Sequence, residues 1–253
     1  MWLKHLHSDT LTGQPFNNRI TMITTIKKNT LEWAKLIKDN YPGPKGADGK
    51  ETDTIYIKGD PSLLLAPEAA RRPRVAVVGT RDIDPYGCQA ICEIITALSK
   101  REDKPIIVSG LAFGVDQYAH RFALQTGLPT VAVLPTGLDK IYPLQHENLA
   151  ADIASTEGCC LVTQFPDKTA PIAVHFIWRN HLITHLADAV IVVESKTKGG
   201  AMVIARLAQE EDIPVFAVPG RMGDLRSEGC NQLIREGIAE ILYDPKTLTT
   251  INL

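Results

Sequence analysis

The chain has 253 residues, of which 44% are apolar and 22% are charged, and its formal net charge is -2. These values are typical of a globular protein built as one large domain, or as one domain with an appendage. They argue against a general nucleic-acid coat, which needs a strong positive charge, but they leave room for a local basic pocket. The sequence also lacks an apolar run of about 18 residues and a secretory signal segment, so we expect no membrane contact.

The cysteines lie inside predicted helices and strands and show no zinc-ligand spacing. Reduced, buried thiols of this kind are typical of a cytoplasmic protein. We therefore expect a cytoplasmic location and no metal site built on cysteine. The cysteines are Cys88, Cys92, Cys159, Cys160 and Cys230.

The N-terminal part of the chain has little regular pattern. Residues 1–21 carry no hydrophobic period, and we expect a disordered leader there. Residues 30–39 place Leu31, Ala34 and Ile37 on one face of a short helix, with Leu36 beside them and Thr30 as the N-cap. We expect a small helical or extended appendage over residues 22–60, which includes a short strand, and a core domain over residues 61–253.

From Arg74 onward, continuous apolar runs alternate with amphipathic segments. The apolar runs predict buried strands at residues 75–79, 105–109, 130–134, 159–163, 189–193, 214–218 and 239–242. The segments between them predict helices at residues 85–100, 115–126, 145–157, 175–187, 200–211 and 227–236. Strands and helices that alternate in this way are joined by right-handed crossovers. The sequence therefore predicts an α/β fold with an open, doubly wound and mostly parallel, Rossmann-like sheet.

The loops that follow parallel strands meet at one edge of such a sheet, which is where ligands bind. Gly110 and Gly114 in one of these loops let a ligand approach the backbone closely. The polar residues at this edge are Arg81, Arg179, Asn180, Lys196, Lys198, Arg221 and Arg226. Together with the helix N-termini they predict an anion site that suits phosphate, although any single arginine could instead pair with a nearby carboxylate.

Catalytic and cofactor motifs are missing from these loops. Residues 79–82 read Gly-Thr-Arg-Asp, so the dinucleotide fingerprint G-x-G-x-x-G fails, and no P-loop sequence occurs. Asp116 and His120 are four residues apart, a spacing that marks a local hydrogen bond more often than a catalytic dyad. The histidines of the helix at 175–187 lack nearby carboxylates, so we interpret them as pocket or surface residues. We expect no enzyme, no cofactor and no metal.

Aromatic side chains accompany the cations of one predicted helix. Phe176 and Trp178 lie next to Arg179 in the sequence. Rings beside cations are the combination that holds stacked nucleic-acid bases. The alternative, that Phe176 simply packs the helix onto the sheet, explains that residue equally well.

A series of short motifs runs in a fixed order along residues 41–243. They are IYIKGD at 55–60, VAVVGTR at 75–81, SGLAFGVD at 109–116 with AH at 119–120, VLPTGLD at 133–139 with IYP at 141–143, HF at 175–176 with RN at 179–180, VVE at 192–194 with GG at 199–200, and VPG at 218–220 with NQLI at 231–234. In order and spacing this set resembles the DNA-processing protein A (DprA/Smf) family.

The resemblance implies an extended Rossmann-like core that binds single-stranded DNA in a basic pocket at the carboxyl edge of the sheet. It also implies a homodimer that loads a RecA-type recombinase during natural transformation. By their positions in the motifs, the residues expected to line the pocket are Arg81, Ser109, Gly110, His175, Phe176, Arg179, Asn180, Gly199 and Gly200. Lys196 and Lys198 are added to this set because they are positively charged and follow a strand at the same edge, not because of the resemblance.

The sequence departs from the family pattern inside the expected pocket. Phe113 and His181 stand where the family usually has arginine, and Trp178 stands where a basic residue is common. We therefore expect a less cationic and more aromatic pocket, in which Phe113 contacts the ligand by stacking. We expect no counterpart of the family's C-terminal winged-helix extension in this sequence, so a member of this kind could act without recombinase loading.

The leading hypothesis is a non-enzymatic protein of recombination that binds single-stranded DNA. The alternative from another class is a Rossmann-like protein that binds or hydrolyses nucleotide derivatives, of the phosphoribohydrolase type. Residues 198–202 keep the two glycines of that group's loop but lack its Gly-Thr pair and its downstream glutamate, which favours binding over hydrolysis. A third hypothesis is an interaction protein whose pocket is vestigial.

Overall fold

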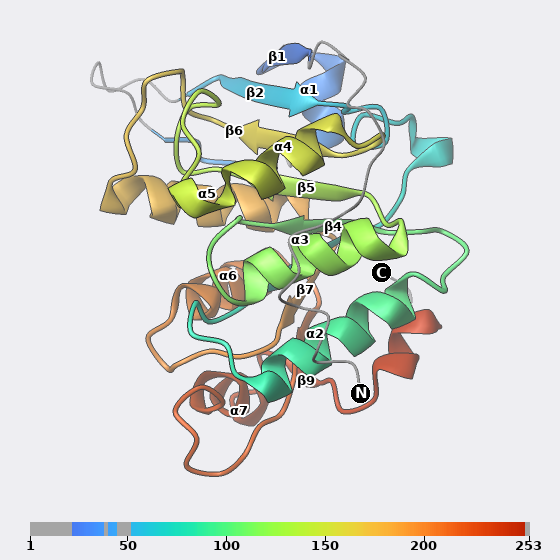
Figure 1. The fold of residues 1–253 in the computed structure, drawn as a ribbon, viewed down its shortest axis with the longest axis vertical. Helices are drawn as coiled ribbons and strands as arrows, with labels where there is room; N and C mark the ends of the chain where they lie inside the picture. Colours follow the sequence, from blue (N-terminus) through green and yellow to red (C-terminus); the bar gives the residue numbers. More distant parts are fainter. Residues whose placement is uncertain (1–21, 38–39, 45–51, 251–253) are drawn as a thin grey trace.

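The computed structural model describes residues 22–37, 40–44 and 52–250, and their arrangement is shown in Figure 1. The leader predicted for residues 1–21 lies outside the described residues. The described strands form one sheet with the order β1-β2-β6-β5-β4-β3-β7-β8-β9. Its strands are β1 (Ile23–Lys27), β2 (Thr54–Gly59), β3 (Arg74–Val78), β4 (Ile106–Ser109), β5 (Thr130–Val133), β6 (Cys160–Thr163), β7 (Ala189–Val192), β8 (Val215–Ala217) and β9 (Glu240–Ile241).

Strands β3 to β9 pair in parallel, whereas β1 and β2 pair antiparallel. The helices are α1 (Leu31–Leu36), α2 (Pro85–Leu98), α3 (Val115–Thr126), α4 (Glu147–Ser155), α5 (Ala173–Leu186), α6 (Gly200–Glu210) and α7 (Glu228–Arg235). The predicted fold, an α/β protein with an open, mostly parallel, doubly wound sheet, is confirmed.

Helices cover both faces of the sheet. In Figure 1, α2, α3 and α4 lie in front of it, and α5 and α6 lie behind it. Val75 and Val77 of β3 pack in a cluster with α2 and α3, whereas Ala76 and Val78 pack in a cluster with α5 and α6. Successive side chains of a strand point to opposite faces, so a sheet covered on both sides needs an apolar residue at every position. This explains the continuous apolar runs.

Local chemistry fixes several helix ends where they were predicted. Asp84 caps α2 by accepting a hydrogen bond from the Gly87 amide at 3.0 Å, and Pro85 occupies the first helical position. Gly127 ends α3 in the left-handed conformation with φ of 71°. The helix predicted at 145–157 is shorter, because residues Leu144–His146 form a 3-10 turn before α4 begins.

Two strands of the predicted appendage, β1 and β2, extend the main sheet. The β1–β2 hairpin joins the sheet through antiparallel pairing of β2 with β6. Strand β1 was not predicted, because in its sequence only Ile26 is buried and an edge strand of this kind carries little apolar signal. The face predicted for α1 is right in part: Ile37 and Leu36 are buried in the core cluster, but Leu31 is 80% exposed, and Trp33 packs into the core in its place.

The strand order creates a crevice beside β3. The chain runs from β3 through β4 and β5 to β6, and it then returns to place β7 on the other side of β3. The loops that leave β3 and β7 therefore diverge at the carboxyl ends of these strands. Open α/β sheets bind ligands at such a switch point.

Candidate nucleic-acid interface

A cavity of about 420 Å³ opens at this switch point, and we call it the main cavity. Its volume lies within the range of about 300–1,000 Å³ that is usual for small-ligand sites. The polar and glycine residues that line it include Gly79, Thr80, Arg81, Asp116, Arg179, Asn180, Ser195, Lys196, Lys198, Gly199 and Gly200. A smaller hollow of about 20 Å³, the side hollow, adjoins it and shares Arg81, Ala112, Phe176 and Arg179 with it.

Arg179 projects from α5 and lies between the two spaces. It is 7% exposed, and its Nη1 atom lies 3.5 Å from Oδ2 of Asp116. Burial lowers the pKa of Arg179 and the Asp116 carboxylate opposes that effect; an arginine stays charged under such conditions. The guanidinium rests on the backbone of Gly110, where an added Cβ would lie 1.2 Å from Nη1. Its Nε atom is buried without a hydrogen-bond partner.

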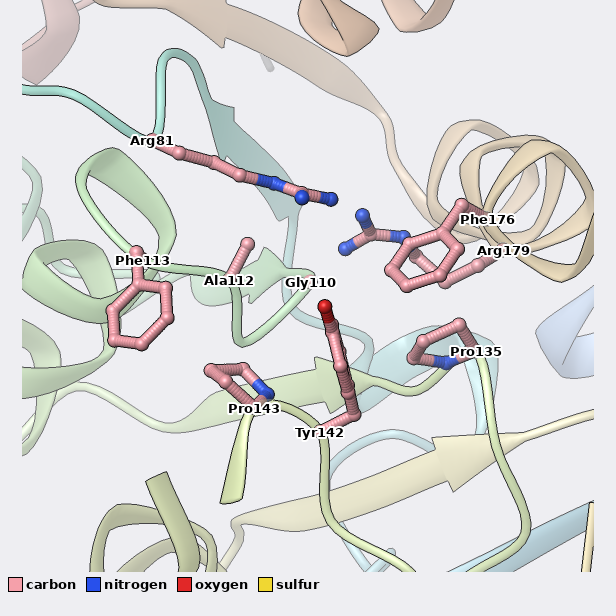
Figure 2. A pocket seen from close by; sticks show the side chains of 9 residues that line it. All are labelled: Arg81, Gly110, Ala112, Phe113, Pro135, Tyr142, Pro143, Phe176 and Arg179. Carbon is pink, nitrogen blue, oxygen red and sulfur yellow. The ribbon is translucent and has the colours of Figure 1, made fainter. Parts of the chain in front are cut away.

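Two guanidinium groups converge on one aromatic ring. The Cζ atom of Arg81 lies 5.4 Å from the centre of the Phe176 ring, and that of Arg179 lies 6.0 Å from it. Figure 2 shows both arginines pointing into the same space beside Phe176. Cation–π contact holds the two positive groups near each other without neutralising them. The arrangement offers two arginine forks and a ring to a single ligand.

The loop that carries Arg81 is fastened on both sides. The Thr80 amide donates to the Glu194 carbonyl at 2.6 Å, and the Thr80 carbonyl accepts from the Val115 amide at 3.0 Å. Asp82 forms an ion pair with Arg226 at 2.9 Å. Arg226 is therefore held by a carboxylate, the alternative that the sequence left open for a single arginine, and it does not line the main cavity.

The N-terminus of α6 supplies the opposite wall. Gly199 caps the helix and Gly200 begins it, and both line the main cavity together with Lys196 and Lys198. Free amides of a first helical turn carry partial positive charge. An added Cβ at Gly199 would lie 2.6 Å from the Ser195 hydroxyl, so glycine fits the close approach of these two segments. This wall suits an anion.

Two of the predicted pocket residues lie elsewhere. Ser109 is fully buried, and its hydroxyl donates to the Val77 carbonyl at 2.7 Å. The ring of His175 packs against Phe165 with centroids 4.3 Å apart, and its Nδ1 atom is bonded to the Ala170 carbonyl. Neither residue lines the main cavity or the side hollow. Their motif positions place them beside the pocket, but their side chains turn away from it.

Tyr142 lines the side hollow and was not among the predicted site residues. It packs edge-on against Phe176, with ring centroids 5.5 Å apart. The only sequence signal for it was the Tyr-Pro motif that belongs to the family resemblance. Phe113, which was predicted for the site, also lines this hollow and is 41% exposed.

Two of the described histidines, His120 and His185, are buried and line neither the main cavity nor the side hollow. His120 bonds to the Thr130 hydroxyl at 2.7 Å, so the hydrogen bond expected with Asp116 is not the one it makes. Its burial lowers its pKa to about 3, and it is neutral at physiological pH. His185 packs against Tyr41 in the interior, at a centroid distance of 4.9 Å, which corrects its reading as a pocket or surface residue.

Glu194 is a buried carboxyl group behind the Arg81 loop. It is 1% exposed, and its Oε2 atom accepts from the Asp84 amide at 3.3 Å. Burial and the neighbouring Asp84 carboxylate raise its pKa to about 7, although Arg226 opposes this. The Oε1 atom has no hydrogen-bond partner. The group is therefore poised to change charge near neutral pH.

Because of Glu194, we expect the free energy of unfolding to fall as the pH rises from about 4.5 to about 7. The folded protein holds the Glu194 proton up to about pH 7, whereas an unfolded glutamate releases it near 4.5. Ionisation between these values therefore costs the folded state up to about 3 kcal/mol. Urea unfolding at pH 5 and pH 8 should show that Glu194→Gln gains stability over the wild type mainly at pH 8. An equal difference at both pH values would contradict the assignment.

No group of three or more metal-ligating side chains occurs among the described residues. None of the helices in the described part of the chain is long and apolar enough to cross a bilayer.

The family model for DNA recombination-mediator protein A matches residues 35–251. The chain belongs to this family. One relative in the recombination-mediator protein A family is DNA processing protein DprA of Streptococcus pneumoniae, which is 36% identical over 202 residues, or 80% of this chain and 68% of that protein. Another is protein Smf of Escherichia coli, which is 38% identical over 216 residues, or 84% of this chain and 52% of that protein.

Solved structures of recombination-mediator protein A relatives share the fold. DprA of Streptococcus pneumoniae superposes with a TM-score of 0.72 at 33% identity, and the match covers 88% of this chain and 76% of that one. DprA of Helicobacter pylori, described for its single-stranded DNA binding mode, gives a TM-score of 0.73 at 29% identity over 91% of this chain and 95% of that one. The chain thus spans most of some relatives and about half of others.

Proposed function

We propose that this chain binds single-stranded DNA as a recombination mediator, with the DNA held in the main cavity. The observation that carries the proposal is the convergence of Arg81 and Arg179 on the Phe176 ring, opposite the N-terminus of α6. Arginine forks and helix amides bind phosphate oxygens, and the ring accepts a base by stacking. The single-strand binding described for the Helicobacter pylori relative supports the same assignment.

The shape of the site favours a single strand over a duplex. The ring and both arginines lie at a cavity rather than on an open ridge. A nucleotide whose base is free can place that base against the ring and its phosphate against the arginines. A duplex buries its base faces in the stack and offers only its backbone.

We further propose that the chain acts without catalysis or cofactor. Asp116, the carboxylate in the main cavity nearest to Arg179, is already engaged by that guanidinium and by the Ala112 amide at 3.3 Å. A RecA-type recombinase as partner and a homodimeric assembly belong to the same proposal because the family resemblance of the sequence implies them, and a cytoplasmic location belongs to it because the reduced cysteines favour it. A nucleotide derivative is the second candidate ligand, because the volume of the main cavity also suits a small molecule.

The test is a titration of labelled single-stranded and double-stranded oligonucleotides of equal length, at two salt concentrations and without metal or ATP. We expect single strands to bind more tightly, and their affinity to fall as salt rises. Equal affinity for both forms, or no binding to either, would remove the proposal. Release of base from nucleoside monophosphates by the purified protein would replace it with the nucleotide function.

Arg81→Ala is expected to weaken single-strand binding and to reduce the salt dependence. Loss of one phosphate contact lowers the slope of log affinity against log salt by about 0.7 for a single strand. Arg206→Ala is the matched control, because Arg206 lies on α6, pairs with Glu236 at 2.9 Å and does not line the main cavity. An unchanged slope in Arg81→Ala would show that this residue does not hold a phosphate.

A further inference from the structure

Aromatic rings and prolines form the wall of the side hollow. Phe113 and Tyr142 lie on either side of Pro143 and Ala112 in Figure 2. The two ring residues are 41% and 39% exposed. Large apolar side chains gathered in the open beside a cavity mark a binding surface, because solvent contact gives them no advantage.

Neighbouring rings hold both aromatic residues in place. Phe113 packs edge-on against His146, with centroids 4.8 Å apart and an interplanar angle of 66°. His146 is fixed in turn by the Leu111 carbonyl at 2.8 Å and the Gln117 side chain at 2.7 Å. Tyr142 packs edge-on against Phe176 with an interplanar angle of 77°. An edge-to-face pair covers one face of only one of its two rings, and a fixed ring loses little entropy when a ligand stacks on it.

The hydroxyl of Tyr142 points toward the positive groups. In Figure 2 it is directed toward the space between Arg81 and Arg179. A ligand group that enters this space would meet two guanidinium groups and one hydroxyl within reach of the rings. Phosphate fits the first part of this surface, and a flat apolar base fits the second.

Carboxylates reduce the net positive charge at this site. Asp116 partly offsets the charge of Arg179, and a second carboxylate, that of Asp82, also lines the main cavity. Phe113 also adds a ring, rather than a charge, to the loop between β4 and α3. Stacking of a base on an aromatic side chain adds affinity that does not depend on charge.

We propose that Tyr142 and Phe113 form a base-stacking subsite that receives the nucleobase next to the phosphate held by Arg81 and Arg179. The proposal rests on the proposed single-strand binding, and it names the residues that contact the base of the bound nucleotide. Every base has an aromatic face, so the subsite takes any base and gives affinity without sequence preference.

The experiment compares two ligands of equal charge: an oligo-dT strand and a strand of the same length made of abasic residues. The variants are Tyr142→Ala, Tyr142→Phe and Phe113→Ala. Tyr243→Ala is the matched control, because Tyr243 is 74% exposed and lines neither space of the site. Circular dichroism melting of each variant establishes that it is folded.

On oligo-dT we expect Tyr142→Ala and Phe113→Ala each to bind roughly tenfold more weakly than the wild type, whereas Tyr142→Phe stays close to it. On the abasic strand these differences should vanish, and the salt slope should match the wild type throughout. If Tyr142→Ala and Phe113→Ala bind oligo-dT as Tyr243→Ala does, or lose equally on both strands, the subsite is refuted while the main cavity stands. If the wild type binds neither strand, the proposed function itself fails.

Discussion

Replacement of Arg179 by alanine is expected to cause the largest loss of single-strand binding, about 10- to 100-fold. Arg179 faces both the main cavity and the side hollow, so its removal takes away charged hydrogen bonds worth about 1.5–3 kcal/mol. It also leaves Asp116 buried without its cation, which should lower the free energy of unfolding by about 1–3 kcal/mol. Fluorescence anisotropy and urea unfolding measure the two effects separately.

A double variant separates binding from stability at this position. Asp116→Asn in the Arg179→Ala background removes the uncompensated carboxylate, so it should recover much of the lost stability and none of the lost affinity. Arg206 is an exposed arginine of α6 that forms an ion pair with Glu236, so Arg206→Ala should change neither the affinity nor the free energy of unfolding by much. A folded Arg179→Ala protein that binds within twofold of the wild type would refute the role of Arg179.

Gly110→Ala is expected to reproduce most of the binding loss of Arg179→Ala without removing a charge. The added Cβ would lie 1.2 Å from Nη1 and 2.4 Å from Cζ of Arg179, so the guanidinium must leave its position. The displaced guanidinium no longer converges with Arg81 on Phe176, and its contact with Asp116 is disturbed as well, so urea unfolding of this variant accompanies the binding measurement. We expect affinity to fall by about tenfold in an anisotropy titration, because one guanidinium contact is lost.

Gly200→Ala is the matched control for this substitution. Gly200 lines the same cavity, but an added Cβ there would meet only the Asn180 side chain, at 3.8 Å. Gly110→Ala should also have little effect in the Arg179→Ala background, because both changes remove the same contact and their effects are not additive. Equal losses from Gly110→Ala and Gly200→Ala would show that the methyl group disturbs the loop in general.

The sequence predicted the elements that depend on local pattern. The runs at β3 and β7 are apolar at every position because helices cover both faces, and Asp84 with Pro85 begins α2 for reasons contained in four residues. Strand β1 and the burial of Trp33 in α1 were missed. Both depend on contacts with distant residues, and Trp33 reaches the core only because the hairpin joins the far side of β6.

The candidate site shows the same difference between what local sequence pattern predicts and what distant contacts decide. Sequence alone determined that Arg81, Arg179 and the Gly199–Gly200 pair belong to loops or helix starts at the carboxyl edge, because strand and helix order fix which segments gather there. Only the tertiary structure decided which side chains face the cavity. Ser109 turns inward to the Val77 carbonyl, Asp82 takes Arg226, and Tyr142 enters from a distant loop to complete the wall. Side-chain direction and pairing are settled by packing between segments, which no single stretch of sequence contains.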